Sequence, residues 1–283
     1  MILPGSLNTL RVRRLAGPGA FLAAPDEAHG PEVLLPGSQV PADVRVGDDL
    51  EVFVYMDSED RPVATTARPR AMVGEVATLR VVAESDAGLF LDWGLPKDLL
   101  LPWNEIPRAQ QQTLEPGRYV TVMVFQDGTG RIAASARLED FIAKEAEGFS
   151  EGEPVRVLVF SRTDLGWRVI VNDRYWGLVH ANEVFGALKP GERREGWVKA
   201  LRDDRRLNIA LTAPGRAKVD PVAQKILDRL EQEGGFMAVG DKTPPEAIYT
   251  LFGVSKKVFK QAIGSLFKAR RIVIEPAGIR LVR

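Results

Sequence analysis

The chain has 283 residues, of which 45% are hydrophobic and 27% charged, values typical of globular proteins that exclude wholesale disorder. It contains no cysteine, which excludes disulfides, thiol nucleophiles and thiolate metal sites. Its two histidines, His29 and His180, are too few for a multi-histidine zinc or iron centre. No apolar run reaches membrane-spanning length and the start lacks a signal-peptide pattern, so we expect a cytoplasmic protein without a membrane span.

The formal net charge is zero, with 38 basic and 38 acidic residues, but the charge is unevenly distributed. Residues 1–71 have 7 Lys and Arg against 10 Asp and Glu, and residues 72–150 have 7 against 12, which gives −3 and −5. Residues 151–216 have 12 against 9 and residues 217–283 have 12 against 7, which gives +3 and +5. Such a chain can meet a polyanion with its carboxy-terminal half, or its two halves can attract each other or a second copy.

Three weak copies of one pattern follow each other along the chain. Residues 33–40 (VLLPGSQV) reappear as residues 99–106 (LLLPWNEI) and again as residues 177–184 (GLVHANEV). After each copy come a glycine turn, a short apolar strand and a charged turn with an arginine, 14 residues beyond the turn glycine. These glycine and arginine pairs are Gly47 with Arg61, Gly117 with Arg131, and Gly191 with Arg205. The pattern predicts a small β unit that is repeated three times.

Each copy also opens with a pair of predicted strands. In the third copy, Val155, Val157 and Val159 alternate with Arg156 and Leu158, as expected for a strand with one buried face. Five short strands joined by glycine and proline turns are typical of an OB-type barrel, which closes on itself and so leaves no bare edge. We therefore predict three five-stranded barrels in series. Their predicted bounds are residues 1–71, 72–150 and 151–216.

The residue patterns of the second and third copies resemble those of the S1 RNA-binding domain. Residues 88–92 (GLFLD) are similar to its first glycine-aromatic phrase, and residues 177–184 are similar to its Gly-Leu-Val-His phrase. The aromatic residue of the first phrase is retained as Phe21 and Phe90, but the third copy has Arg168 there. The histidine of the second phrase is retained only as His180, since the other two copies have Pro36 and Pro102.

Residues 217–283 have a different composition and predict a fourth domain. Helical spacing of apolar residues predicts helices over residues 222–233, 244–252 and 256–270, the last one capped by Ser255. In that helix, Val258, Phe259, Ala262, Ile263, Leu266 and Phe267 are expected to face inward. Residues 272–282 read as two strands around a Pro-Ala-Gly turn. Three helices followed by a hairpin resemble a winged-helix domain, a variant of the helix-turn-helix.

Three S1-like barrels followed by a winged helix resemble the conserved virulence factor B family of bacterial S1 proteins over nearly the whole chain. The fold class expected is mainly β with an α+β carboxy-terminal domain. The resemblance implies RNA binding in the regulation of RNA metabolism or gene expression, and it implies no catalysis. We therefore expect no enzyme activity, no catalytic residue, no metal and no cofactor.

In the third copy, aromatic and basic side chains lie close together in the sequence. They predict a surface on which single-stranded bases stack while arginines contact phosphates. One or two of these rings could instead fill the barrel, and His180 could be a base contact or a structural residue. The predicted RNA-binding residues are Arg162, Trp167, Arg168, Tyr175, Trp176, His180, Lys199 and Arg202. Phe21 and Phe90 are weaker candidates because their barrels are acidic.

Basic residues also surround the third helix of the winged-helix domain. They predict phosphate or groove contacts, although a charge run on an exposed helix is often only a solvated face. The residues concerned are Lys256, Lys257, Lys260, Arg270 and Arg271.

Taken together, these patterns predict a protein that captures single-stranded RNA with its third barrel and its winged helix. Two alternatives stay open. The winged helix could instead make the chain a DNA-binding regulator that prefers duplexes. The acidic residues 1–150 could make it an interaction scaffold that docks on the ribosome or on another protein.

Overall fold

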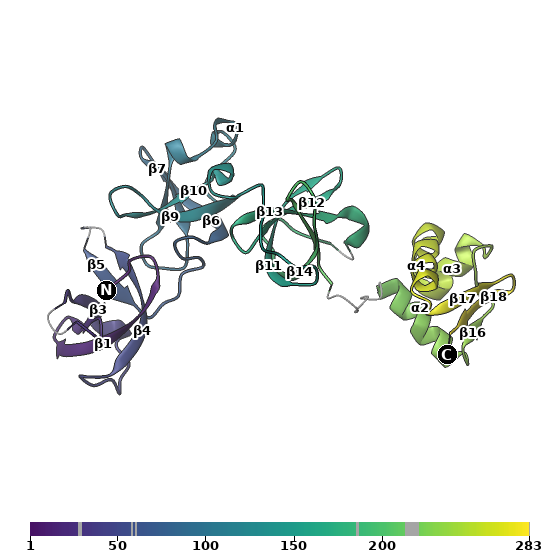
Figure 1. Ribbon diagram of the computed structural model, residues 1–283, viewed down its shortest axis with the longest axis horizontal. Helices are drawn as coiled ribbons and strands as arrows, with labels where there is room; N and C mark the ends of the chain where they lie inside the picture. The colour runs from purple at the N-terminus through teal and green to yellow at the C-terminus, as the bar shows by residue number, and fades with distance from the viewer. Residues whose placement is uncertain (28–29, 58, 60, 185–186, 213–220, 283) are drawn as a thin grey trace. The chain divides into compact units, whose positions relative to one another are not determined.

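The computed structural model describes residues 1–27, 30–57, 59, 61–184, 187–212 and 221–282 (Figure 1). His29 and the predicted boundary between residues 216 and 217 lie outside the described residues. The chain divides into two compact units. The first consists of Met1–Ala181 with Leu188–Ile209, and the second of Asn182–Ala187 with Ala210–Arg283.

The first unit contains the three predicted five-stranded barrels. Barrel 1 is closed, with strand order β1-β2-β3-β5-β4. Its strands are β1 (Leu7–Ala16), β2 (Gly19–Ala23), β3 (Val33–Pro36), β4 (Asp49–Met56) and β5 (Pro62–Thr65). A parallel pairing of Leu34 with Val63 closes it, and Leu22, Leu35 and Val54 are among the fully buried residues of its core.

Barrels 2 and 3 repeat this plan. The strands of barrel 2 are β6 (Val76–Ser85), β7 (Gly88–Asp92), β8 (Leu99–Pro102), β9 (Tyr119–Gln126) and β10 (Ile132–Ser135), in the order β10-β9-β6-β7-β8 with β8 and β10 in contact. The strands of barrel 3 are β11 (Pro154–Thr163), β12 (Gly166–Val171), β13 (Tyr175–His180), β14 (Arg193–Leu201) and β15 (Leu207–Ala210). Barrel 3 is closed in the order β11-β12-β13-β15-β14.

One glycine at the start of the second strand is required by the backbone in every barrel. Gly19, Gly88 and Gly166 have φ of +148°, +152° and +149°, values that other residues rarely adopt. A Cβ atom at these positions would lie 2.0, 2.2 and 2.1 Å from a carbonyl oxygen of the third strand. The repeated glycine therefore marks a close approach of two strands, which explains why the three copies share it.

The first strand of each barrel also carries the same irregularity. The pairing register shifts between Val12 and Arg14 in β1 and between Val159 and Ser161 in β11, with the matching shift in β6. A bulge of this kind bends a strand and increases its twist. The bend lets one long strand pair with the second strand at one end and the fourth strand at the other, as barrel closure requires.

Barrels 2 and 3 are joined by a buried carboxylate and an apolar cluster. The backbone N–H of Val76 donates to Asp173 (3.2 Å), whose side chain is 5% exposed and pairs with Arg193 at 3.2 Å and Arg156 at 3.3 Å. Arg193 also donates to the Val76 carbonyl. Beside them, Met123, Leu138 and Ile142 pack against Leu158, Ile170 and Trp176 of barrel 3. This junction covers part of the outer surface of barrel 3.

The second unit contains the winged-helix domain. Its helices are α2 (Pro221–Gln232), α3 (Pro245–Phe252) and α4 (Lys256–Lys268). Its strands β16 (Phe236–Met237), β17 (Ile272–Glu275) and β18 (Gly278–Leu281) form a sheet in the order β16-β18-β17. Figure 1 shows the three helices grouped beside this sheet. A further short helix, α1 (Arg108–Gln111), lies in barrel 2.

Helix α4 departs from the predicted inward face at two positions. Phe259, Ala262, Ile263 and Leu266 are buried as predicted, but Val258 is 36% exposed and Phe267 is 51% exposed. Both lie next in sequence to a buried residue, and a helix turns by about a quarter turn per residue, so they sit at the rim of the core face. The Val258 backbone N–H donates to the Ser255 hydroxyl at 3.4 Å, which confirms the predicted cap. Within the described residues, no helix is long and apolar enough to cross a membrane.

Candidate nucleic-acid interface

A groove of about 560 Å³ lies on the outer face of barrel 3, over β12, β13 and β15. Successive residues of a strand point to opposite faces, so Val169 points into the barrel while Arg168 points out. Arg168 pairs across the strands with Leu178, and both line the groove. The side chains that line the groove include four cations, and we call this surface the basic groove. Its cations are Lys144, Arg168, Arg202 and Arg206.

Each cation of the basic groove has a carboxylate nearby. Asp204 lies 3.1 Å from Arg202 and 3.8 Å from Arg206, and Glu139 lies 2.6 Å from Arg168 and 3.9 Å from Lys144. The four cations are 33% to 69% exposed. Ion pairs at such exposure contribute little net stability, so an incoming phosphate can replace these carboxylates at small cost.

Trp176 forms the floor of the groove and is 6% exposed. The Arg168 guanidinium lies 3.5 Å above its indole ring, and the Phe160 ring packs at 5.2 Å. Its indole N–H is buried without a partner among the described residues. The predicted role of Trp176 as an exposed stacking ring therefore does not fit this structure, because Arg168 and Phe160 lie against the ring and it belongs to the buried cluster at the junction with barrel 2. The plane that faces the groove is the Arg168 guanidinium, which can itself stack on a base.

The other two predicted rings of barrel 3 lie outside the groove. Trp167 pairs with Val179 and so lies on the inner face of the barrel, half-buried at its end beside the exposed Arg162. Tyr175 is half-buried and packs edge-on against Phe149 at 5.4 Å. For these rings, the alternative that they pack into the protein describes the structure better than an open stacking surface does.

The remaining predicted residues of barrel 3 are split between its faces. His180 shares the outer face with Leu178 and is half-buried at the end of β13, opposite Gly166. Lys199 is exposed on β14 and does not line the groove. Arg202 lines the groove together with Arg168, so the structure brings these two predicted residues together.

Two cations of the groove were missed by the sequence pattern. Arg206 occupies the same hairpin position as Arg61 in barrel 1 and Arg131 in barrel 2. In each hairpin, the carbonyl of this arginine accepts the backbone N–H of the residue four positions earlier, which is Asp57, Asp127 or Arg202. The 14-residue spacing pointed to Arg205 instead, since barrel 3 has one extra residue between the glycine and this hairpin. Lys144 comes from the segment after barrel 2, where no repeat pattern could have identified it.

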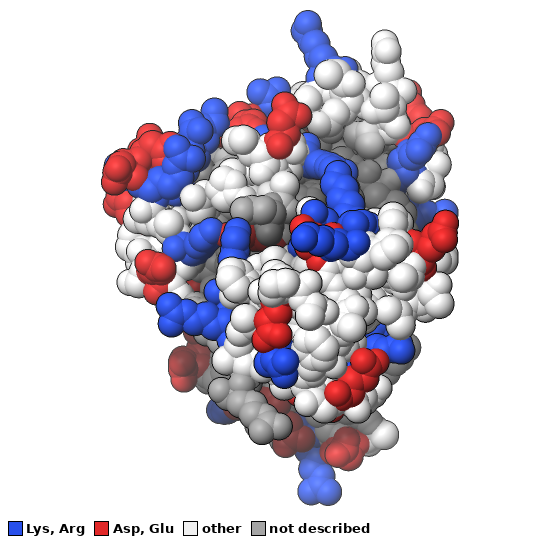
Figure 2. All heavy atoms as spheres, turned by 90° about the vertical axis from the view of Figure 1, so that its right-hand side faces the viewer, with Lys and Arg blue, Asp and Glu red and all other residues white. Residues whose placement is uncertain are grey.

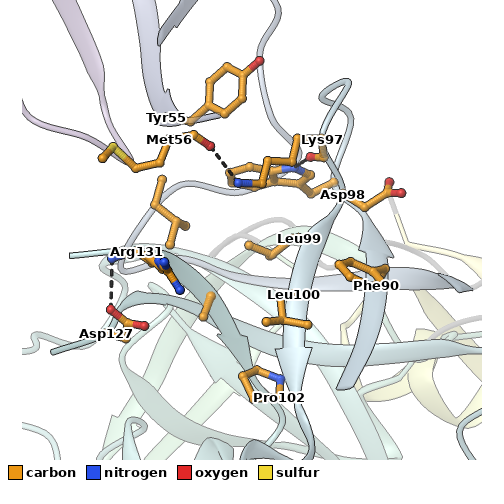
Figure 3. A pocket seen from close by; sticks show the side chains of 13 residues that line it. Tyr55, Met56, Phe90, Lys97, Asp98, Leu99, Leu100, Pro102, Asp127 and Arg131 are labelled. Carbon is orange, nitrogen blue, oxygen red and sulfur yellow. Dashed lines mark hydrogen bonds between the residues drawn. The ribbon is translucent and has the colours of Figure 1, made fainter. Parts of the chain in front are cut away.

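The same outer face of barrel 2 carries a different set of residues (Figure 3). Phe90, Leu100 and Pro102 stand where barrel 3 has Arg168, Leu178 and His180, as the strand registers show. They line a pocket of about 370 Å³. Tyr55 and Met56 of barrel 1 close its upper side in the view of Figure 3.

Lys97 and Asp127 are charged residues that line this pocket, and both are held in hydrogen bonds within the protein. The Lys97 ammonium donates to the carbonyls of Met56 (3.1 Å) and Asp57 (2.7 Å), which ties barrel 2 to barrel 1. Asp127 accepts from the hydroxyl of Thr129 at 2.7 Å and from the N–H of Arg131 at 3.0 Å. The Thr129 hydrogen bond is the main reason that the pKa of Asp127 lies below its ordinary value.

The aromatic candidate of barrel 1 is covered by a neighbouring side chain. The Arg14 guanidinium lies 3.4 Å from the centre of the Phe21 ring and pairs with Glu32 at 3.0 Å. Phe21 is therefore a half-buried ring under a paired cation, whereas Phe90 lines an open pocket.

The predicted cations of the winged-helix domain differ in how far they are engaged. Lys257, Arg270 and Arg271 are exposed, and Lys256 is half-buried at the start of α4. Lys260 forms an ion pair with Asp241 at 2.6 Å. Figure 2, which views the molecule from the right-hand side of Figure 1, shows basic side chains gathered near the middle of that face with acidic ones scattered among them.

Comparison with known proteins agrees with this architecture. The S1 domain matches residues 4–67 and 73–137, which hold the strands of barrels 1 and 2. The CvfB-like winged helix domain matches residues 224–281. Conserved virulence factor B of Staphylococcus epidermidis strain RP62A is 27% identical over 285 residues, covering 99% of this chain and 95% of that protein. The chain therefore resembles the conserved virulence factor B proteins over nearly its whole length, and its carboxy-terminal domain matches their winged helix.

Two further relatives extend over nearly the same length. Conserved virulence factor B of Staphylococcus aureus strain USA300 is 27% identical and covers 99% of this chain and 94% of its own. The uncharacterized protein YitL of Bacillus subtilis strain 168 is 28% identical and covers 96% of this chain and 91% of its own. The S1 domains matched at residues 4–67 and 73–137 and the basic groove of barrel 3 together indicate nucleic-acid binding.

A solved structure from Streptococcus pneumoniae is similar along the whole chain. It is described as a multidomain protein with nucleic acid binding domains. It is 24% identical, covers 99% of this chain and 98% of its own, and superposes with a TM-score of 0.43.

Proposed function

We propose that this protein binds single-stranded RNA in the basic groove of barrel 3, with the winged-helix domain adding phosphate contacts. The observation that supports this most is the replacement pattern on one face. Where barrel 2 has Phe90, Asp127 and Pro102, barrel 3 has Arg168, Arg202 and His180. A barrel face that carries positive charge in this way favours a polyanionic ligand.

The groove supplies both kinds of contact that a single strand needs. Arg202 and Arg206, on one hairpin, both line the groove, and each can pair with a phosphate of a bound strand. Arg168 offers its guanidinium plane to a base, and Leu178 beside it adds an apolar surface. Stacking tolerates every base, so little sequence specificity should follow. We propose a role in the regulation of RNA metabolism or gene expression, in the cytoplasm and without catalysis.

A titration with two ligands tests this function. A labelled uridine-rich single-stranded RNA and a duplex DNA of equal length are titrated with the full chain at several salt concentrations. We expect tighter binding to the RNA and a linear decrease of log affinity with log salt. A preference for the duplex would favour a DNA-binding regulator led by the winged helix. Binding of neither would favour a protein-docking scaffold that uses residues 1–150.

A paired variant locates the site. Arg202→Ala combined with Arg206→Ala removes two groove cations and should weaken RNA binding about 30-fold, because each charge-assisted contact contributes on the order of 1 kcal/mol. Arg61→Ala is the matched control, since Arg61 holds the same hairpin position in barrel 1 and pairs with Asp57 at 2.9 Å. Equal losses in both proteins would contradict a site in barrel 3.

A further inference from the structure

An acidic segment between barrels 2 and 3 lies on barrel 3. We call residues 139–147 the acidic strap. Its Ala143 forms a parallel bridge opposite Tyr175 at the start of β13. The Ala143 N–H donates to the Arg174 carbonyl at 2.9 Å, and the Ala143 carbonyl accepts from the Trp176 N–H at 2.9 Å. The N–H of Ala146 donates to the Arg205 carbonyl at 2.8 Å, in the β14–β15 hairpin. Backbone hydrogen bonds at Ala143 and Ala146 therefore hold the second half of the strap against the barrel.

The strap brings its carboxylates to cations of barrel 3. Glu139 lies 2.6 Å from Arg168 of barrel 3. It also lies 3.9 Å from Lys144, a residue of the strap itself that lines the basic groove. Glu145 lies 3.5 Å from Arg205, just outside the groove, and Glu147 also pairs with Arg205. Glu139 is 50% exposed, so solvent and ligands can reach it.

We propose that Glu139 is an affinity- and length-determining residue that occupies the place of a nucleic-acid phosphate until a strand displaces it. This inference rests on the proposed RNA-binding function. In the free protein, Glu139 pairs with Arg168 and Lys144 while the Arg168 guanidinium lies over Trp176, and so it offsets part of their positive charge. A strand that binds the groove must exchange this carboxylate for one of its phosphates.

The exchange favours long ligands over short ones. Replacing one carboxylate by one phosphate on Arg168 gains little, because both are anions that pair with the same exposed cation. A strand that also contacts Arg202 and Arg206 gains further ion pairs in the same binding step, which a mononucleotide cannot do. Glu139 therefore raises the number of nucleotides that a ligand needs for binding.

A pair of variants with the same charge change tests the role of Glu139. Glu139→Gln removes the carboxylate and keeps the shape of the side chain. Asp140→Asn makes the same change in net charge one residue away, at a carboxylate that pairs with Arg137 at 2.8 Å and not with a groove cation. Each full-length protein is titrated with uridine-rich RNA of increasing length at several salt concentrations, and thermal unfolding verifies that the variants fold.

We expect Glu139→Gln to bind RNA about 2- to 5-fold more tightly than the natural chain, the range for release of an exposed ion pair. The plot of log affinity against log salt should become steeper by about 0.7 for each phosphate newly bound. The gain should be largest for the shortest strands. Asp140→Asn should bind like the natural chain, and Glu139→Gln should lose most of its gain in an Arg168→Gln background.

Each other outcome overturns the proposal. Equal gains in Glu139→Gln and Asp140→Asn would mean that only long-range charge matters. RNA binding by the natural chain with no change in Glu139→Gln would overturn the role of Glu139 and leave the proposed function intact. If neither the natural chain nor Glu139→Gln binds RNA, both proposals are wrong.

Discussion

Barrels 2 and 3 share a strand order, a bulged first strand and a strained glycine, yet their matching outer faces differ in chemistry. The face of barrel 2 presents Phe90 and Pro102 beside a turn aspartate, and the face of barrel 3 presents Arg168 and His180 beside a turn arginine. The fold is set by inward-facing residues and by turns, which the two barrels have in common. The outward-facing residues are free to vary, and they decide which ligand the face can bind.

The hairpin between the fourth and fifth strands shows how the change is accommodated. In barrel 2, Asp127 accepts the N–H groups of Thr129 and Arg131 and so stabilises its own turn. In barrel 3, the acceptor of the Arg206 N–H is Asp204, at 3.3 Å. Asp204 lies two residues after position 202, which is the position that corresponds to Asp127. Because Asp204 provides a turn acceptor, position 202 can carry a cation without leaving the turn uncapped.

The largest effect on RNA binding is expected when barrel 3 is given the outward-facing residues of barrel 2. The double variant Arg168→Phe with Arg202→Asp should bind single-stranded RNA about 30-fold more weakly, because two contacts that each contribute about 1 kcal/mol are lost. It should unfold at nearly the natural temperature, because both positions lie on the outer surface. Affinity is measured by fluorescence anisotropy near 0.1 M salt.

The reciprocal change in barrel 2 is the control for that variant. Phe90→Arg with Asp127→Arg adds positive charge to the pocket of Figure 3, where Lys97 already contacts barrel 1. If adding these two arginines to the barrel 3 double variant restores its full RNA affinity, then total charge decides binding and the position of the charge in the chain is unimportant. If the barrel 3 variant binds RNA as tightly as the natural chain, the difference between the two faces has no functional meaning.

A second prediction asks whether barrel 3 accounts for all of the binding. Changing Lys256, Lys257 and Lys260 together to Glu should weaken RNA binding about 5-fold at moderate salt and flatten its salt dependence. The effect is smaller than for the groove because Lys260 already pairs with Asp241 at 2.6 Å. Unchanged affinity in filter-binding assays would remove the winged helix from the RNA interface.

Much of the fold could be predicted because its signals are local. The pair of strands predicted to open each copy is present in every barrel, as β1 with β2, β6 with β7 and β11 with β12, and a glycine begins the second strand each time. Helices α3 and α4 begin within one residue of the predicted starts, where a proline and the Ser255 cap mark them. Periodicity and turn chemistry are properties of short segments, so a single sequence is enough to show them.

The candidate site was harder to predict because it depends on contacts between distant segments. Trp176 has the sequence context of a stacking ring, and nothing near it in the sequence shows that it shares a buried cluster with Met123 and Ile142. Lys144 and Glu139 reach the groove from the segment after barrel 2, which belongs to no repeat. A strand's alternation shows which residues face outward, but it cannot show which of these a neighbouring barrel covers.

The smallest expected effect is a difference in stability between the β9–β10 hairpin of barrel 2 and the β14–β15 hairpin of barrel 3. The pKa of Asp127 is lowered in the folded protein, mainly by the Thr129 hydrogen bond, so its contribution to stability is present above the unfolded value of about 3.9 and is lost as the pH falls through the folded value. Asp127→Asn should therefore lower the free energy of unfolding at pH 6 by less than about 1 kcal/mol, since the side chain is largely hydrated, and this difference should shrink under acid conditions. Arg202→Ala, at the matching position of barrel 3, removes no acceptor from its turn because Asp204 accepts the turn N–H there, so it should leave the free energy of unfolding at pH 6 nearly unchanged. Urea unfolding at pH 6 and near pH 3 measures the free energy of unfolding of both variants. If Asp127→Asn remained equally destabilised in acid, the hydrogen bonds of Asp127 to the turn would not require its charged carboxylate.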